Sequence, residues 1–199
     1  MARKYELKER ARGQAATRLA ITEAAVELHR TVGPARTTVT DVAKRAGVHR
    51  TTVYEHFPDE GALFRACSAH WDAAHPPPDI EAWARIAEPP RRLRLALSEL
   101  YAYYADGAEM LDRVLHDARS VPALTSYLAE EWDPLLDAIV ETLAADWPVR
   151  GAAARRLRAL LRVAVDFPTW KTLTGPGGMS SRTAATTIAA AVRCATAKP

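Results

Sequence analysis

Apolar residues recur every three or four positions along most of the chain, which is the spacing of one face of an α-helix. The first such stripe predicts a helix over residues 14–32, ended by Gly33-Pro34. Later stripes predict helices at four further places: 90–105, 122–146, around 157–164 and around 185–192. No segment alternates with period two and no Asn-Gly hairpin signal occurs, so we expect an all-α fold.

Prolines and glycines divide these helical segments. Pro134 falls inside the 122–146 stripe and should kink that helix, or restart it with Asp133 as its cap. The run His75-Pro76-Pro77-Pro78-Asp79 cannot be helical and predicts a hinge, and Gly175-Pro176-Gly177-Gly178 predicts a loop before the last helix.

The most informative stretch is 38–57. Thr38 and Asp41 have the spacing of a capping box at the start of a short helix, and Gly47 suits the positive-φ turn that ends it. A second short helix over 49–57 turns Val53 and Phe57 inward. This arrangement predicts a helix-turn-helix, although a solvated helix pair in an ordinary bundle has the same polar outer face.

The outer face of the second helix carries side chains that suit a DNA major groove. Arg50 is able to form a forked pair with guanine, and Thr51 and Thr52 offer a hydroxyl and a methyl group to bases. Tyr54 and His56 are able to donate to phosphate oxygens.

These residues resemble the DNA-binding domain of TetR/AcrR-type transcriptional regulators. The shared pattern is Thr38-x-x-x-Val42-Ala43-x-x-Ala46-Gly47-Val48-x-x-x-Thr52-Val53-Tyr54-x-His56-Phe57, followed by Leu63. The resemblance covers residues 14–65 well and the rest more loosely, through Phe167-x-x-Trp170-x-x-Leu173 in the penultimate helix. It implies a three-helix DNA-binding domain over 1–58 and a linking fourth helix that leads into an effector-binding and dimerisation bundle over 59–199.

The resemblance assigns DNA-binding roles residue by residue. Thr38 would begin the helix that abuts the phosphate backbone, and Thr40 would point outward from it. The other residues it places at the interface are His49, Arg50, Thr51, Thr52, Tyr54 and His56. His49 replaces the small Ser or Thr of the family, and Glu60 stands where the family has Lys, which puts that phosphate contact in doubt.

Composition and charge agree with this assignment. The 199 residues carry a net charge of +3, of which residues 1–70 contribute +4 (12 Lys/Arg, 8 Asp/Glu) and residues 71–199 contribute −1 (15 against 16). A phosphate-binding module explains this asymmetry, as does chance. A basic N-terminal arm (Arg3, Lys4, Lys8, Arg10, Arg12 and Arg18) could offset Glu60 by following the DNA backbone, or could be a frayed terminus.

Several functional classes find no support in the sequence. No apolar run is long enough to span a membrane, and no signal peptide is visible, so we expect a cytoplasmic protein. Cys67 and Cys194 form no disulfide framework. His70-x-Asp72-x-x-His75 lacks the spacing of a helical zinc site, and we expect no metal, no cofactor and no enzymatic activity.

The remaining two thirds of the chain predict a pocket and a dimer. All five tryptophans lie from Trp71 onward, and the residues that we expect to line an effector pocket are Trp83, Tyr101, Tyr104, His116, Trp132, Phe167 and Trp170. The same aromatic residues equally suit a plain core. Small residues in the last helix, Ala184 to Ala191, predict packing against a second copy, or against the helix's own chain.

The sequence thus predicts a dimeric, ligand-responsive transcriptional regulator. We expect it to act as a repressor that binds a palindromic double-stranded operator and is released by a small, mostly apolar effector. The alternatives are a helical binding or scaffold protein with no DNA role, and a helical-bundle enzyme, for which no catalytic motif is present.

Overall fold

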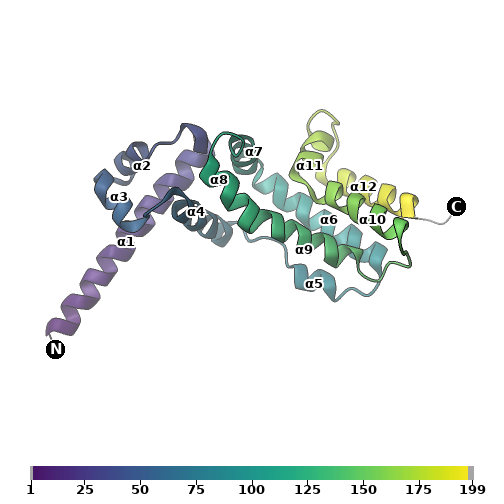
Figure 1. The fold of residues 1–199 in the computed structure, drawn as a ribbon, viewed down its shortest axis with the longest axis horizontal. Coiled ribbons are helices and arrows are strands. Elements are labelled where there is room, and N and C mark those ends of the chain that lie inside the picture. The colour runs from purple at the N-terminus through teal and green to yellow at the C-terminus, as the bar shows by residue number, and fades with distance from the viewer. Residues whose placement is uncertain (1, 197–199) are drawn as a thin grey trace. The chain divides into compact units, whose positions relative to one another are not determined.

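The structure of the protein, a computed structural model, describes the backbone of residues 2–196 and the side chains of residues 5–196 (Figure 1). All regular secondary structure in this part of the chain is helical, which confirms the predicted fold class. The α-helices are α1 (Ala2–Thr31), α2 (Val39–Ala46), α3 (Arg50–His56), α4 (Glu60–Ala74), α5 (Ile80–Ala84), α6 (Pro89–Asp106), α7 (Ala108–Asp117), α8 (Pro122–Tyr127), α9 (Asp133–Ala144), α10 (Ala152–Val165), α11 (Phe167–Thr174) and α12 (Ser181–Thr196). A short 3-10 helix covers Pro34–Arg36 and a π-helical stretch covers Leu128–Trp132.

Helix α1 begins much earlier than the expected residue 14, because it starts at Ala2. Its first turns contain Ala, Arg, Lys, Glu and Leu, which have high helix propensity. They show no apolar periodicity because they pack against nothing, and residues 5–16 are exposed. Hydrophobic spacing reports which residues are buried, so it detected only the packed part of the helix.

The predicted break at Pro134 is confirmed. The stripe expected over 122–146 divides into α8, the π-helical stretch and α9, and Pro134 lies in the first turn of α9. The cap is not Asp133, because the residue before α9 is Trp132, which keeps a helical conformation and makes no side-chain capping bond.

The chain folds into two compact units. The first consists of the chain up to Pro76 together with Glu109–Leu128, and the second consists of Pro77–Ala108 and the chain from Ala129 onward. The boundary expected after residue 58 therefore lies inside the first unit, which also contains α4, α7 and α8.

The core of the first unit lies between α1 and the short helices α2, α3 and α4. One face of α1 contributes Ile21, Ala24 and Ala25. The facing side chains are Val42 and Ala43 from α2, Val53 and Phe57 from α3 and its end, and Leu63 and Cys67 from α4. The small alanines allow the helices to approach closely, so that three short helices share the support of one long one.

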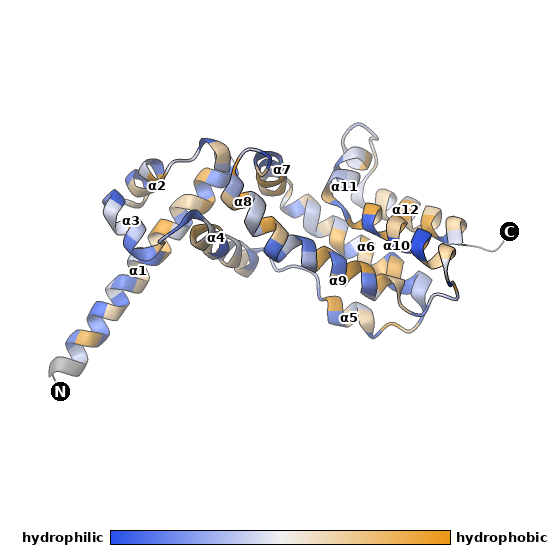
Figure 2. Cartoon of the chain, viewed as in Figure 1, coloured by the Kyte–Doolittle hydropathy of each residue, from blue (hydrophilic) through white to orange (hydrophobic). Residues whose placement is uncertain are grey.

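The core of the second unit forms where α6 packs against α12 and where α10 packs against α9 and α12. In Figure 2 the helices of this unit alternate apolar and polar bands along their length. Four residues of α12, Ala184, Ala185, Ala189 and Val192, are buried within their own chain. Much of the small-residue stripe that predicted a dimer therefore packs on the chain itself, while Ala190 and Ala191 stay exposed.

Among the described residues, no helix combines the length and the apolar character needed to cross a membrane.

His29 is a buried titratable group in the first unit, in ring contact with Phe64 at 5.4 Å between centroids. Burial lowers the pKa of His29 from 6.5 to about 4, and the charge of Asp117 offsets only part of this effect. Between these two pH values His29 is protonated in the unfolded chain but stays neutral in the folded chain. Stability is therefore lost as the pH falls from about 6.5 toward 4.

We expect the free energy of unfolding to be roughly 2 kcal/mol lower at pH 5 than at pH 7 from this residue alone. Denaturant titrations at a series of pH values measure it. His29→Gln should flatten the curve over this range, whereas His49→Gln, at an exposed position, should leave the curve unchanged. A His29→Gln variant that keeps the wild-type slope would assign the effect to other groups.

Candidate nucleic-acid interface

The start of α2 is fixed by a reciprocal capping box. The Thr38 hydroxyl accepts from the backbone N–H of Asp41 at 3.2 Å, and the Asp41 carboxylate accepts from the Thr38 N–H at 3.0 Å and from its hydroxyl at 2.5 Å. The hydrogen bonds from Thr38 hold the pKa of Asp41 below its usual range. The predicted cap is thus confirmed, and it leaves Thr38 exposed at the first turn of the helix.

Gly47 makes the turn between α2 and α3. Its φ of 69° lies in the left-handed region, and its N–H donates to the last carbonyls of α2. Val48 continues this cap, since its N–H donates to the Ala43 carbonyl at 3.0 Å while its side chain packs on the core. The ion pair between Arg45 and Glu27 ties α2 to α1 from outside. Backbone hydrogen bonds from Gly47 and Val48 therefore fix the turn, and the ion pair fixes α2 to α1.

The outer face of α3 presents a coupled pair of side chains. The Arg50 guanidinium donates to the Tyr54 hydroxyl at 2.9 Å and lies 5.4 Å from the centre of its ring. Both residues are exposed, and 44% of Tyr54 is accessible. Because the Tyr54 oxygen accepts from Arg50, its own O–H is free to donate to an external acceptor such as a phosphate.

The other predicted interface residues lie on the same two helices. Thr40 and Thr51 are exposed, and Thr52 and His56 are half-buried. His49 is the exposed N-cap of α3, but its side chain makes no capping hydrogen bond. The structure therefore brings the eight predicted residues onto one helix-turn-helix.

Arg18 has a role that the sequence did not reveal. It was grouped with the basic arm, yet its guanidinium donates to the backbone carbonyl of His56 and lies 4.1 Å from the centre of the Phe57 ring. It thereby holds the end of α3 against α1 across 38 residues of sequence. No local pattern identifies such a partner, because the contact exists only when the two helices pack.

The remainder of the basic arm belongs to α1. The exposed part of this helix from Tyr5 onward carries mostly polar residues, as the predominance of blue in Figure 2 shows. Lys8, Arg10 and Arg12 are exposed there, and Arg12 pairs with Glu9 at 3.0 Å. The side chains of Arg3 and Lys4 lie outside those described.

The N-terminus of α4 is acidic. The Asp59 carboxylate caps it by accepting from the Ala62 N–H at 2.7 Å, and Glu60 is exposed in the first turn. Both carboxylates favour the helix dipole. A phosphate group at this end of α4 would meet negative charge. Glu60 therefore disfavours the phosphate contact that Lys makes in the family.

Four of the seven predicted pocket residues form one aromatic cluster in the second unit. Tyr104 contacts Phe167 at 5.5 Å and Trp170 at 6.2 Å between ring centres, and Tyr101 stacks on Tyr104 at 6.2 Å. The hydroxyl of Tyr101 donates to the carbonyl of Ala164, and that of Tyr104 to the carbonyl of Val165. Burial raises the pKa of both tyrosines well above its usual value.

The other three predicted pocket residues lie elsewhere. Trp83 is fully buried, and its indole N–H donates to the Glu99 carboxylate at 2.6 Å. Trp132 is half-buried at the end of the π-helical stretch. His116 is exposed on α7, in the first unit.

A small pocket lies in the first unit, among His29, Thr37, Thr38, Phe64 and Val121. Its volume of about 40 Å³ suits a water molecule rather than an effector.

Residues 21–67 match the family model of bacterial regulatory proteins of the tetR family. This segment contains the whole helix-turn-helix and its supporting core. Residues 21–67 therefore form a domain of this family. No curated protein matches the sequence.

Solved structures of transcriptional regulators share the fold over nearly the whole chain. NalD of Pseudomonas aeruginosa, the secondary repressor of the MexAB-OprM multidrug efflux pump, is 21% identical, with a TM-score of 0.60 over 90% of this chain and 94% of its own. A transcriptional regulator from Rhodococcus sp. Rha1 is 19% identical, with a TM-score of 0.58 over 92% and 99%. A TetR transcription regulator from Haloarcula marismortui is 14% identical, with a TM-score of 0.56 over 92% and 97%.

The matched domain and the fold together support a DNA-binding transcriptional regulator, with its helix-turn-helix in the first unit. The fold shared with NalD covers 90% of this chain and therefore extends into the second unit.

We expect Arg18→Ala to weaken DNA binding on all sequences alike, because it loosens the end of α3 without removing a base contact. It should also lower the free energy of unfolding by about 1–2 kcal/mol, since a hydrogen bond from a charged group is lost. Binding isotherms on random DNA and thermal unfolding measure the two effects. Arg12→Ala removes an equal charge from the same helix, and an equal loss of stability in that variant would contradict the assignment.

Proposed function

We propose that this chain is a dimeric, ligand-responsive repressor that binds a palindromic operator through two copies of the helix-turn-helix. The observation that carries the proposal is the Arg50–Tyr54 pair on the exposed face of α3. In this proposal the Arg50 guanidinium donates two hydrogen bonds to a guanine edge. Tyr54 orients Arg50 and donates its own O–H to a phosphate of the DNA backbone. The repressor role is supported by the fold shared with NalD.

The test of the DNA-binding function is an operator selection with the full-length protein and random double-stranded DNA. We expect a two-fold symmetric consensus, with half-sites separated by about one helical turn or a multiple of it. Binding should weaken steeply with salt because phosphate contacts release counterions. Failure to enrich any sequence would favour the alternative of a helical binding or scaffold protein without a DNA role.

We expect Arg50→Ala to cost about 1–3 kcal/mol on the selected operator and to relax the preference at one base pair in each half-site. Tyr54→Phe removes both the phosphate donor and the acceptor that orients Arg50. It should therefore weaken binding to all sequences and also reduce part of the preference that depends on Arg50. Competition binding against single-base operator variants separates the two effects.

An equal loss on random and cognate DNA in Arg50→Ala would show that Arg50 contacts phosphate rather than a base. Thr51→Ala, at an exposed position on the same helix, serves as a comparison that leaves the Arg50–Tyr54 pair in place.

The dimer is assigned to α10 and α12, the last two long helices. Outward-facing small and apolar side chains support this choice: Ala159 and Val163 on α10, and Ala190, Ala191 and Cys194 on α12. Val163 is 56% exposed, which is unusual for a valine in a folded helix. A second copy packed on these faces would cover these side chains and fix the spacing of the two helix-turn-helix motifs.

Substitutions at two adjacent alanines of α12 test dimerisation and folding separately. Ala190 is exposed, so Ala190→Glu should leave the fold intact and raise the dimer dissociation constant by roughly tenfold or more. Ala189 is only 1% exposed, so Ala189→Glu should instead unfold the chain at lower temperature, because a buried carboxylate costs several kcal/mol. Sedimentation and thermal unfolding distinguish the two outcomes.

Ala102→Glu, at an exposed position on α6, is the matched control and should leave the oligomeric state unchanged. A dimer that persists in Ala190→Glu at the wild-type affinity would place the interface on another face.

The effector site is assigned to the second unit, next to the aromatic cluster of Tyr101, Tyr104, Phe167 and Trp170. A small, mostly apolar molecule fits this chemistry, since the rings offer apolar area and the two tyrosine hydroxyls offer polar contacts. An effector that enters this cluster has to displace the hydrogen bonds from Tyr101 and Tyr104 to the end of α10. That rearrangement couples occupancy of the site to the packing of α6 and α10.

A further inference from the structure

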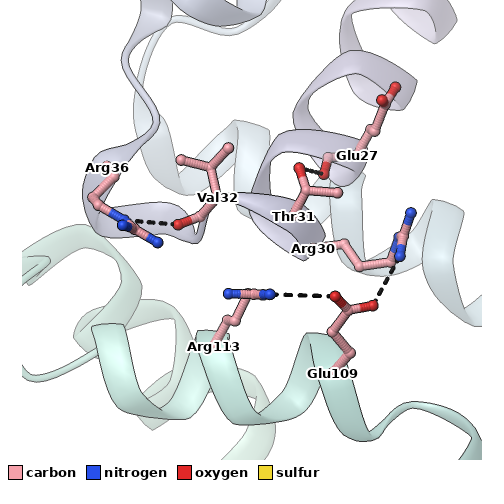
Figure 3. Close-up of polar contacts among 7 residues, drawn as sticks. All are labelled: Glu27, Arg30, Thr31, Val32, Arg36, Glu109 and Arg113. Carbon is pink, nitrogen blue, oxygen red and sulfur yellow. Dashed lines mark hydrogen bonds and ion pairs between the residues drawn. The ribbon is translucent and has the colours of Figure 1, made fainter.

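Helix α7 lies far from the helix-turn-helix in sequence, yet both belong to the same compact unit. Figure 3 shows a contact of α7 with α1, in which the Glu109 carboxylate accepts from Arg30 at 2.8 Å, and a contact within α7, in which it accepts from Arg113 at 3.2 Å. A second contact is made by Asp117 at the other end of α7, and it reaches the turn that leads into α2. Asp117 lies outside the matched segment 21–67.

We propose that Asp117 is a positioning residue for DNA binding, which holds the turn before α2 and thereby sets where that helix begins. The proposal rests on the DNA-binding function proposed above.

The contact of Asp117 with the turn is close and specific. Its Oδ2 atom accepts from the backbone N–H of Ala35 at 2.9 Å. The same oxygen lies 2.6 Å from where a Cβ on Gly33 would be, so the carboxylate sits directly on the glycine. Gly33 also has a φ of 95°, which other residues rarely adopt. The backbone conformation at residue 33 therefore favours glycine, and a Cβ there would push the Asp117 carboxylate aside.

The turn is otherwise held by its own short hydrogen bonds. The Thr37 hydroxyl donates to the Gly33 carbonyl at 2.8 Å, and the Thr37 N–H donates to the Pro34 carbonyl at 3.2 Å. The Arg36 side chain donates to the Val32 carbonyl at 3.0 Å, as Figure 3 shows. These bonds define the shape of the turn, and Asp117 is what connects it to α7.

The next residue along the chain is Thr38, the N-cap of α2. The capping box fixes the first turn of α2 relative to Thr38, but it does not fix Thr38 relative to the rest of the unit. The Asp117–Ala35 hydrogen bond acts three residues upstream, and the carboxylate is a charged acceptor, so the bond is stronger than a neutral one. Displacing the turn would displace the exposed Thr38 and Thr40, and with them the approach of α2 to the DNA backbone.

The test compares Asp117→Ala, Asp117→Asn and Glu109→Ala in the full-length protein. Asp117→Ala should weaken operator binding roughly tenfold, which is what losing a charge-assisted hydrogen bond produces. Asp117→Asn keeps a side-chain oxygen and should recover most of the affinity. Glu109→Ala removes the exposed ion pair of the same helix without touching the turn, and should stay within about twofold of wild type.

Two measurements separate positioning from a general loss of stability. Amide hydrogen exchange over residues 35–41 should accelerate in Asp117→Ala while exchange in the second unit is unchanged. In a double-mutant cycle with Thr38→Ala, the two losses of operator affinity should be less than multiplicative, because both act through the start of α2.

The proposal is overturned if Asp117→Ala binds the operator as wild type does, if Asp117→Asn is as defective as Asp117→Ala, or if exchange over 35–41 does not change. Absence of DNA binding by the wild-type protein would instead refute the proposed function, and the exchange experiment would still decide whether Asp117 orders the turn.

Discussion

The DNA-binding surface depends on the packing of short helices against one face of α1. Helix α3 has seven residues and buries only Val53 within them, so it has no stability of its own. Its place is set by Phe57 in the core with Ile21 and Ala25, and by Arg18, which holds its last turn from α1. Every outward side chain on α3, including Arg50 and Tyr54, takes its direction from that packing.

Hydrogen bonds at the helix ends add stability to that of the small core. The capping box of Thr38 and Asp41 and the left-handed Gly47 satisfy the backbone groups at the two ends of α2. Thr38 caps α2 and is also exposed, so the residue that stabilises the start of this helix is one of those proposed to contact DNA. This double use explains why the start of α2 has polar contacts on both sides, from Asp41 within the helix and from Asp117 at the preceding turn.

In the second unit, aromatic side chains supply the hydrogen bonds at a helix end. The hydroxyls of Tyr101 and Tyr104 donate to the carbonyls of Ala164 and Val165, where α10 ends and α11 begins. Carbonyls at a helix end have no partner within the helix, so the tyrosines of α6 satisfy groups that would otherwise be buried unpaired. A cluster with these hydrogen bonds is a packed core that joins α6 to the end of α10.

The sequence by itself determined the helical class, the helix-turn-helix and its cap, because these depend on interactions within a few residues. Thr38 and Asp41 are three positions apart, Gly47 acts on its own backbone, and the break at Pro134 follows from a missing N–H. The start of α1 was not visible, because its first turns bury nothing and leave no periodic pattern, whereas its end before Gly33 was predicted correctly. The contacts of Arg18 and Asp117 and the burial of Ala189 became visible only in the packed structure. Arg18 and Asp117 each act on a partner that is distant along the chain, and the burial of Ala189 depends on which helices pack around α12. The chemical character of a residue is local, whereas its partner depends on how the helices pack.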